Sequence, residues 1–126
     1  MERSIDDRNI LDDFCIKFCE VMEKHVKYII VSGFVAISTG RKRGTEDIDM
    51  IIERLSKPSF IDLHQELVRG GFVCMQSDNA ETIYDDYLTQ KASVRYTYID
   101  GHGPEMEVKF AKDRLDEIQL LLWLSE

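Results

Sequence analysis

Two aspartates, Asp47 and Asp49, stand one residue apart in the otherwise apolar stretch "TEDIDMII", residues 45–52. Residues two apart on a β-strand project to the same face, so the two carboxylates are expected about 5–7 Å apart. They repel by about 1 kcal/mol in water, and by more where the effective dielectric constant is lower. A divalent cation turns this repulsion into ligation, because Mg²⁺ binds carboxylate oxygens together with substrate phosphates. The alternative is that both side chains lie at a solvated end of the strand.

The residues before the aspartates are suited to holding phosphate. The stretch "IIVSG", residues 29–33, predicts a strand that ends at Gly33, where the missing Cβ lets the chain turn and lets a phosphate approach the backbone. A helix that starts after it offers N–H groups to an anion. Arg41 and Arg43 add cationic donors, and Thr45 adds a hydroxyl. The alternative for the cluster "RKR", residues 41–43, is a solvated loop.

A third carboxylate is expected from the strand "EMEVKF", residues 105–110. Glu105 and Glu107 lie on the same face of that strand, so alternation alone does not separate them. We prefer Glu107 because apolar residues flank it on both sides, whereas Glu105 follows the proline of a turn. Three acids beside a phosphate cradle suit nucleotidyl transfer, in which two metals hold a triphosphate for in-line attack by a hydroxyl.

The elements that must position these residues follow from periodicity and from turn residues. The sequence predicts helices over residues 7–26, 58–69 and 112–125, strands over 26–33, 47–53 and 72–76, and a hairpin of strands 93–100 and 105–110 that turns at Asp100 and Gly101. Residues 77–91 carry no pattern that assigns them. This order indicates an α/β or α+β fold, with a mixed β-sheet flanked by helices.

Length and charge set the limits of the interpretation. A chain of 126 residues is expected to form a single domain over 1–126. Its net charge of −8 argues against broad, non-specific binding of nucleic acid. No apolar run approaches the roughly 20 residues of a membrane span, so no membrane partner is expected. Cys15 and Cys19 are four residues apart, a spacing typical of two small buried side chains, and unpaired cysteines favour a cytoplasmic location.

The motif residues together resemble the nucleotidyltransferase superfamily related to DNA polymerase β, in particular its small, single-domain prokaryotic members. Those proteins show a glycine after the first strand, then a strand of the pattern acid–hydrophobic–acid, and later a lone acid between hydrophobic residues. The corresponding stretches are "IIVSGF", "TEDIDMII" and "MEVKF". The resemblance covers residues 28–110 and implies a nucleotidyltransferase-like fold.

The resemblance implies a role for each matched position. Asp47 and Asp49 would ligate two Mg²⁺ or Mn²⁺ ions, and Glu107 would ligate the catalytic ion and help deprotonate the attacking hydroxyl. The residues implied to bind the triphosphate are Ser32, Gly33, Arg43 and Thr45.

The sequence departs from the family pattern at two positions. Phe34 stands where a second glycine or a serine is usual, and the third acid is a glutamate where aspartate is more usual.

Three functions are compatible with the sequence. The first is an active nucleotidyltransferase that moves a nucleoside monophosphate from an NTP, with ATP the expected donor, to a hydroxyl of a small molecule, a protein or an RNA end. The second is a toxin–antitoxin component that binds an all-helical protein or forms a homodimer through the apolar end "IQLLLWLSE", residues 118–126, unless that end is a core helix or the truncated end of a longer chain. The third is a degenerate member that kept the fold and lost catalysis.

Overall fold

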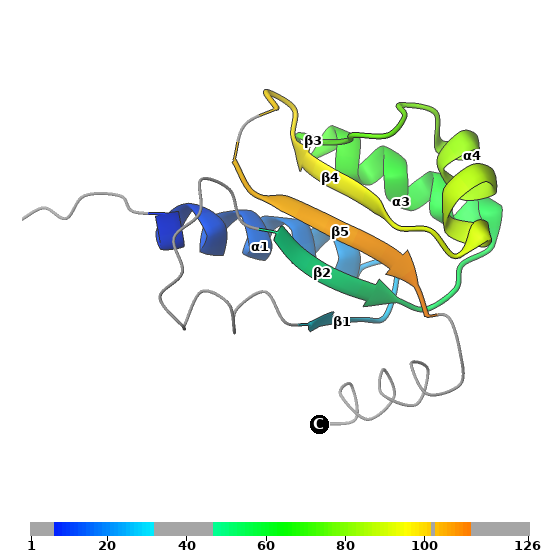
Figure 1. Cartoon of the computed structure of the whole chain (residues 1–126), viewed down its shortest axis with the longest axis horizontal. Coiled ribbons are helices and arrows are strands. Elements are labelled where there is room, and N and C mark those ends of the chain that lie inside the picture. The colour runs from blue at the N-terminus through cyan, green and yellow to red at the C-terminus, as the bar shows by residue number, and fades with distance from the viewer. Residues whose placement is uncertain (1–6, 32–46, 102, 112–126) are drawn as a thin grey trace, which may run out of the picture.

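A five-stranded sheet with helices packed on one face makes up the described part of the chain (Figure 1). The computed structural model describes residues 7–31, 47–101 and 103–111. The mixed sheet flanked by helices that the sequence predicted is confirmed in this part. The turn expected after Gly33 and the helix expected over 112–125 lie outside the described residues. None of the described helices is long and apolar enough to cross a lipid bilayer.

The strand order of the sheet is β1-β2-β5-β4-β3. The five strands are β1 (Tyr28–Val31), β2 (Asp47–Ile52), β3 (Phe72–Cys74), β4 (Val94–Tyr98) and β5 (Glu105–Phe110). The central pair, β2 and β5, is parallel, and every other neighbouring pair is antiparallel. Strands β2 and β5 therefore begin at the same edge of the sheet and end at the same opposite edge.

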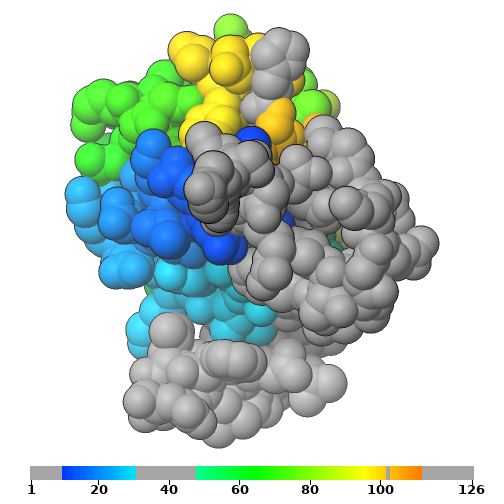
Figure 2. Space-filling view, turned by 90° about the vertical axis from the view of Figure 1, so that its left-hand side faces the viewer, coloured from blue at the N-terminus to red at the C-terminus, as the bar shows by residue number. Residues whose placement is uncertain are grey.

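Two helices, α1 (Asp7–Glu23) and α3 (Lys57–Arg69), cover one face of this sheet (Figure 1). The apolar face of α1 is buried, with Phe14 and Phe18 fully enclosed. Both phenylalanine rings meet the ring of Phe72 edge-on, at centroid distances of 5.6 and 5.1 Å. The opposite side of α1 carries charged residues and is part of the outer surface shown in blue in Figure 2. Cys15 and Cys19 are buried, as their spacing predicted.

Helix α3 begins and ends where its sequence predicts. The side chain of Ser56 accepts a hydrogen bond from the backbone N–H of Ser59, which satisfies one of the N–H groups left unpaired at a helix start. Pro58 lies in the first turn, where a missing N–H costs nothing. Gly71 follows the helix with φ +98°, a conformation that favours glycine.

The segment that the sequence left unassigned folds into three short turns of helix at one end of the sheet. They are α4 (Ala80–Thr82), a π-helical turn η1 (Ile83–Tyr87) and a 3₁₀ turn η2 (Leu88–Gln90). Ile83 and Leu88 are buried and anchor the segment to the core. The segment therefore belongs to the packed domain.

Candidate functional site

The parallel ladder between β2 and β5 brings together the acids that the sequence singled out. Asp49 is the register partner of Glu107, and Asp47 is the partner of Glu105. Partners in a parallel pair project to the same face, and neighbouring strands are about 4.8 Å apart. Ile48 and Met106 point into the core on the helix side, so Asp49 and Glu107 lie side by side on the other face.

Strand β1 leads the chain toward Asp49. Its last residue, Val31, pairs with Asp49 in an antiparallel ladder. The chain therefore leaves β1 at the edge where β2 and β5 begin. The predicted phosphate-binding residues that follow β1 lie outside the described residues; they are Ser32, Gly33, Arg43 and Thr45. Phe34, one of the two departures from the family pattern, also lies outside them. The structure places the backbone of Asp47 and does not describe its side chain.

An arginine from the third strand joins the acids. Arg95 on β4 is the register partner of Glu107. Its Nη2 lies 3.9 Å from Oε1 of Glu107, and its Nε lies 3.8 Å from Oε1 of Glu105. The side chain of Arg95 is 44% exposed, and both distances are near the upper limit for an ion pair. Such loose, solvated pairs contribute between 0 and about 1 kcal/mol.

Ser93 fixes the orientation of Glu107. Its Oγ donates a hydrogen bond to Oε2 of Glu107 at 2.5 Å. This length is typical of a hydrogen bond from a hydroxyl to a carboxylate. One oxygen of Glu107 is therefore held by Ser93, while the other faces Arg95. The described contacts thus distinguish Glu107 from Glu105: Glu107 is held by Ser93 and lies beside Asp49, the second acid of the D-x-D pattern.

The donor set has the chemistry of a site for a hard divalent cation. Asp49 and Glu107 offer carboxylate oxygens, which Mg²⁺ and Mn²⁺ prefer, and Asp47 is two positions away on the same strand. Among the described side chains, no group of three or more histidine, cysteine, aspartate or glutamate residues is arranged to hold a metal ion. The two glutamates instead face the guanidinium of Arg95.

Sequence reasoning missed Ser93 and Arg95. A signal for them was present, because Ser93 and Arg95 alternate with the buried Val94 and Tyr96 in "SVRY". Alternation places them on one face of the strand, but only the register of β4 against β5 brings them to Glu107. The chain matches no protein-family model, no curated protein and no solved structure.

Proposed function

We propose that this chain is a metal-dependent nucleotidyltransferase with a nucleotidyltransferase-like fold, which moves a nucleoside monophosphate from an NTP to a hydroxyl acceptor. The observation that carries the proposal is the parallel register of Asp49 with Glu107. An acid from the D-x-D pattern and the lone acid more than fifty residues later meet on one face of the sheet. This is the convergence that the resemblance to the superfamily implies.

The described residues have separate tasks in this proposal. Asp49 and Glu107, with Asp47, would hold the divalent cations. Bound there, the cations would neutralise the charge of the triphosphate and activate the attacking hydroxyl. Ser93 keeps the Glu107 carboxylate in one orientation. Arg95 reduces the repulsion among the acids.

A catalytically inactive member of the same fold is the second candidate. The contacts of Arg95 favour this candidate, because the guanidinium supplies a positive charge that offsets the repulsion among the acids without a metal ion. The two candidates differ in whether the acids bind a divalent cation together with a nucleotide.

Thermal unfolding with Mg²⁺ and each NTP tests the proposal on wild type, on Asp49→Asn and on Asp62→Asn. Asp62 is an exposed residue of α3, so its variant makes the same charge change away from the acids. A ligand that binds only the folded chain stabilises it by about 2.7 kcal/mol at a hundredfold excess over Kd. We expect a metal-dependent stabilisation in wild type and in Asp62→Asn, and none in Asp49→Asn.

Transfer of label from an α-labelled NTP to an acceptor would then separate the two candidates. If no NTP stabilises wild type, nucleotidyl transfer by this chain is contradicted. If an NTP stabilises wild type and no label is transferred to any acceptor class, the inactive member is favoured.

A further inference from the structure

A concave site lies at the opposite edge of the parallel pair, where β2 and β5 end. It is a cavity of about 140 Å³ between the two strand ends and the segment 84–91. A cavity of about 150 Å³ lined by apolar side chains holds benzene. Asp49 and Glu107 lie three residues before the ends of their strands, which is about 10 Å along each strand. This cavity is therefore separate from the acids.

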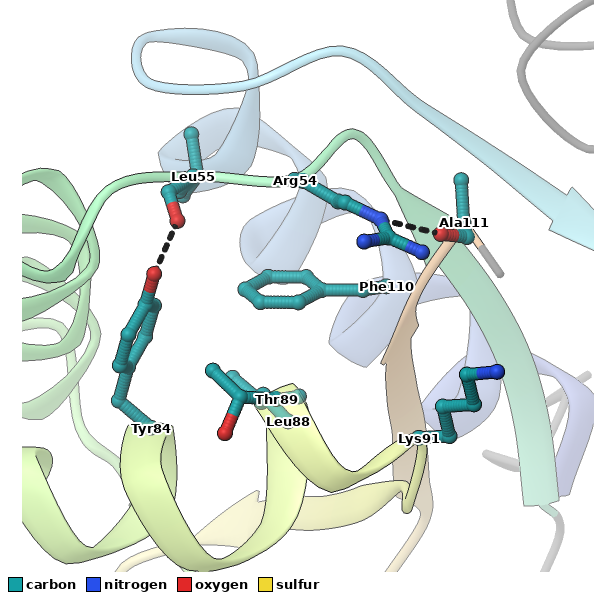
Figure 3. A pocket seen from close by; sticks show the side chains of 8 residues that line it. All are labelled: Arg54, Leu55, Tyr84, Leu88, Thr89, Lys91, Phe110 and Ala111. Atoms are coloured by element: carbon teal, nitrogen blue, oxygen red, sulfur yellow. Dashed lines mark hydrogen bonds between the residues drawn. The ribbon is translucent and has the colours of Figure 1, made fainter. Parts of the chain in front are cut away.

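Most of the described residues that line the cavity are apolar, and the hydroxyl groups of Tyr84 and Thr89 donate hydrogen bonds to backbone carbonyls within the chain. Figure 3 shows Tyr84 and Leu55 on one side, Arg54 and Ala111 on the other, and the ring of Phe110 between them. The Tyr84 hydroxyl donates to the Leu55 carbonyl at 2.7 Å. The ring of Tyr84 thus faces the cavity beside Phe110, while its hydroxyl is already bonded.

The charged residues among the described lining of the cavity are both cationic. Of the described residues that line it, Arg54 and Lys91 are positively charged and none is acidic. The chain as a whole carries a net charge of −8, so this lining stands apart from the rest of the sequence. Nε of Arg54 donates to the Ala111 carbonyl at 3.0 Å, which holds the guanidinium at the edge of the cavity. The two cationic side chains would attract an anionic group.

The backbone that carries this wall is unusual. The π-helical turn η1 contributes Tyr84, and π-helical turns occur frequently at functional sites. Lys91 has φ +65° and is the one non-glycine residue with positive φ in the described parts of the chain. A side chain at such a position costs free energy that glycine would avoid. Lys91 is the C-cap of the 3₁₀ turn η2, and this conformation places the residue at the rim of the cavity.

We propose that this cavity is a second ligand site, which takes a small organic anion with a single-ring or short aliphatic body and a carboxylate or phosphate head. The apolar body packs against Phe110 and Leu88. The anionic head lies toward Arg54, within reach of the flexible side chain of Lys91. This site does not depend on the proposed function of the acids.

Titration of the full chain with four probes, followed by amide chemical shifts in NMR spectra, tests this proposal. Benzoate and phenyl phosphate carry a ring and an anionic head, benzyl alcohol carries the ring alone, and inorganic phosphate carries the charge alone. We expect saturable shifts of residues 84–91 and 110–111 with benzoate or phenyl phosphate, and at least about tenfold weaker binding of the other two probes. The tighter of the first two probes identifies the head as carboxylate or phosphate.

Variants at the rim give a second measurement. Lys91→Gly removes one cation, and glycine fits the left-handed backbone, so the variant is expected to fold. We expect it to weaken the binding of the tighter of benzoate and phenyl phosphate by about tenfold. Lys91→Arg is expected to keep the binding, as is Arg69→Gln, which removes an exposed cation that does not line the cavity. The proposal is overturned if benzyl alcohol binds as well as benzoate and phenyl phosphate do, if the shifts lie elsewhere, or if no probe binds at millimolar concentration.

Discussion

Arg95 on β4 lies directly opposite Glu107 on β5, with its Nη2 3.9 Å from Oε1 of the carboxylate. The same guanidinium has its Nε 3.8 Å from Oε1 of Glu105. One positive charge thus lies beside two glutamates on the strand next to Asp49. A divalent cation that binds these acids must compete with the guanidinium of Arg95, since both are attracted to the same carboxylates.

Removing the guanidinium should strengthen metal binding. We expect Arg95→Gln to bind Mn²⁺ about three- to tenfold more tightly than wild type in the absence of nucleotide, because the carboxylates lose a competing cation. The stability of the metal-free chain should fall by no more than about 1 kcal/mol, since Arg95 is 44% exposed. Isothermal titration calorimetry measures the first quantity, and urea unfolding measures the second.

Arg69→Gln is the matched control for this variant. Arg69 is 72% exposed at the end of α3 and pairs loosely with Glu66. The same loss of one positive charge there should leave the Mn²⁺ affinity unchanged. Weaker Mn²⁺ binding in Arg95→Gln than in Arg69→Gln would show that Arg95 assists the metal, contrary to this prediction.

The two glutamates of β5 should differ in their effect on activity. Glu107 is the partner of Asp49 and is held by Ser93, whereas Glu105 is the partner of Asp47. We expect Glu107→Gln to lower nucleotidyl transfer at least about a hundredfold, as expected for a group that acts on the attacking hydroxyl. Glu105→Gln should lower it less than about tenfold. Single-turnover transfer from an α-labelled NTP measures both, and the reverse order of effects would make Glu105 the third acid.

The hairpin shows how far the sequence could predict this site. Both strands and the turn at Gly101 are confirmed, and the backbone N–H of Gly101 donates to the Tyr98 carbonyl at 2.8 Å. A two-residue turn at Asp100 and Gly101 would place Arg95 opposite Met106. The observed connection runs over residues 99–104 and places Arg95 opposite Glu107. A register shift of one residue between β4 and β5 changes which side chains of the two strands lie on the same face. The contacts of Arg95 could therefore not be derived from alternation alone.

The segment 77–91 was unpredictable for a different reason. Its turns are too short for a helical period to be visible, and their hydrogen bonds change from α to π to 3₁₀ within about ten residues. By contrast, α1 and α3 each run for three turns or more, with apolar residues at helical spacing and, for α3, a serine cap. Long periodic elements could be predicted from the sequence, whereas the wall of the cavity could not.

Replacing Lys91 by glycine should stabilise the chain. A left-handed conformation costs an L-residue about 1–2 kcal/mol, and glycine gives back part of this gain through its greater freedom in the unfolded chain. We expect Lys91→Gly to raise the free energy of unfolding by about 0.5–1 kcal/mol, measured by urea denaturation. Lys91→Ala is the control, because alanine keeps the Cβ and should give no gain. Equal stabilisation by both variants would contradict a backbone cause.

His64 should make the chain less stable in mild acid. Its ring is buried on α3, and Nδ1 lies 2.8 Å from the Tyr96 hydroxyl. Burial lowers the pKa of His64 below its ordinary value, and a hydrogen bond to the backbone of Asp78 opposes this only in part. Burial also raises the pKa of Tyr96, so its hydroxyl stays protonated beside the neutral imidazole.

The direction of the pH effect follows from proton binding in the two states. As the pH falls through about 6.5, the unfolded chain protonates His64 while the folded chain does not, so protons favour unfolding. The contribution of His64 is therefore complete above about pH 6.5 and is lost as the pH falls toward the lowered pKa of the folded state. The loss is at most about 1.4 kcal/mol for each pH unit.

Urea unfolding at intervals between pH 5 and pH 7.5 measures this loss. His64→Gln should flatten the profile between pH 5 and 6.5, although it should also lower stability at pH 7.5 by about 1–2 kcal/mol through its altered bond to Tyr96. His25→Gln is the control, because His25 is half-buried beside Glu66 and makes no contact with Tyr96 among its described hydrogen bonds. If His25→Gln flattens the profile and His64→Gln does not, His64 is already protonated in the folded chain at these pH values, contrary to its burial.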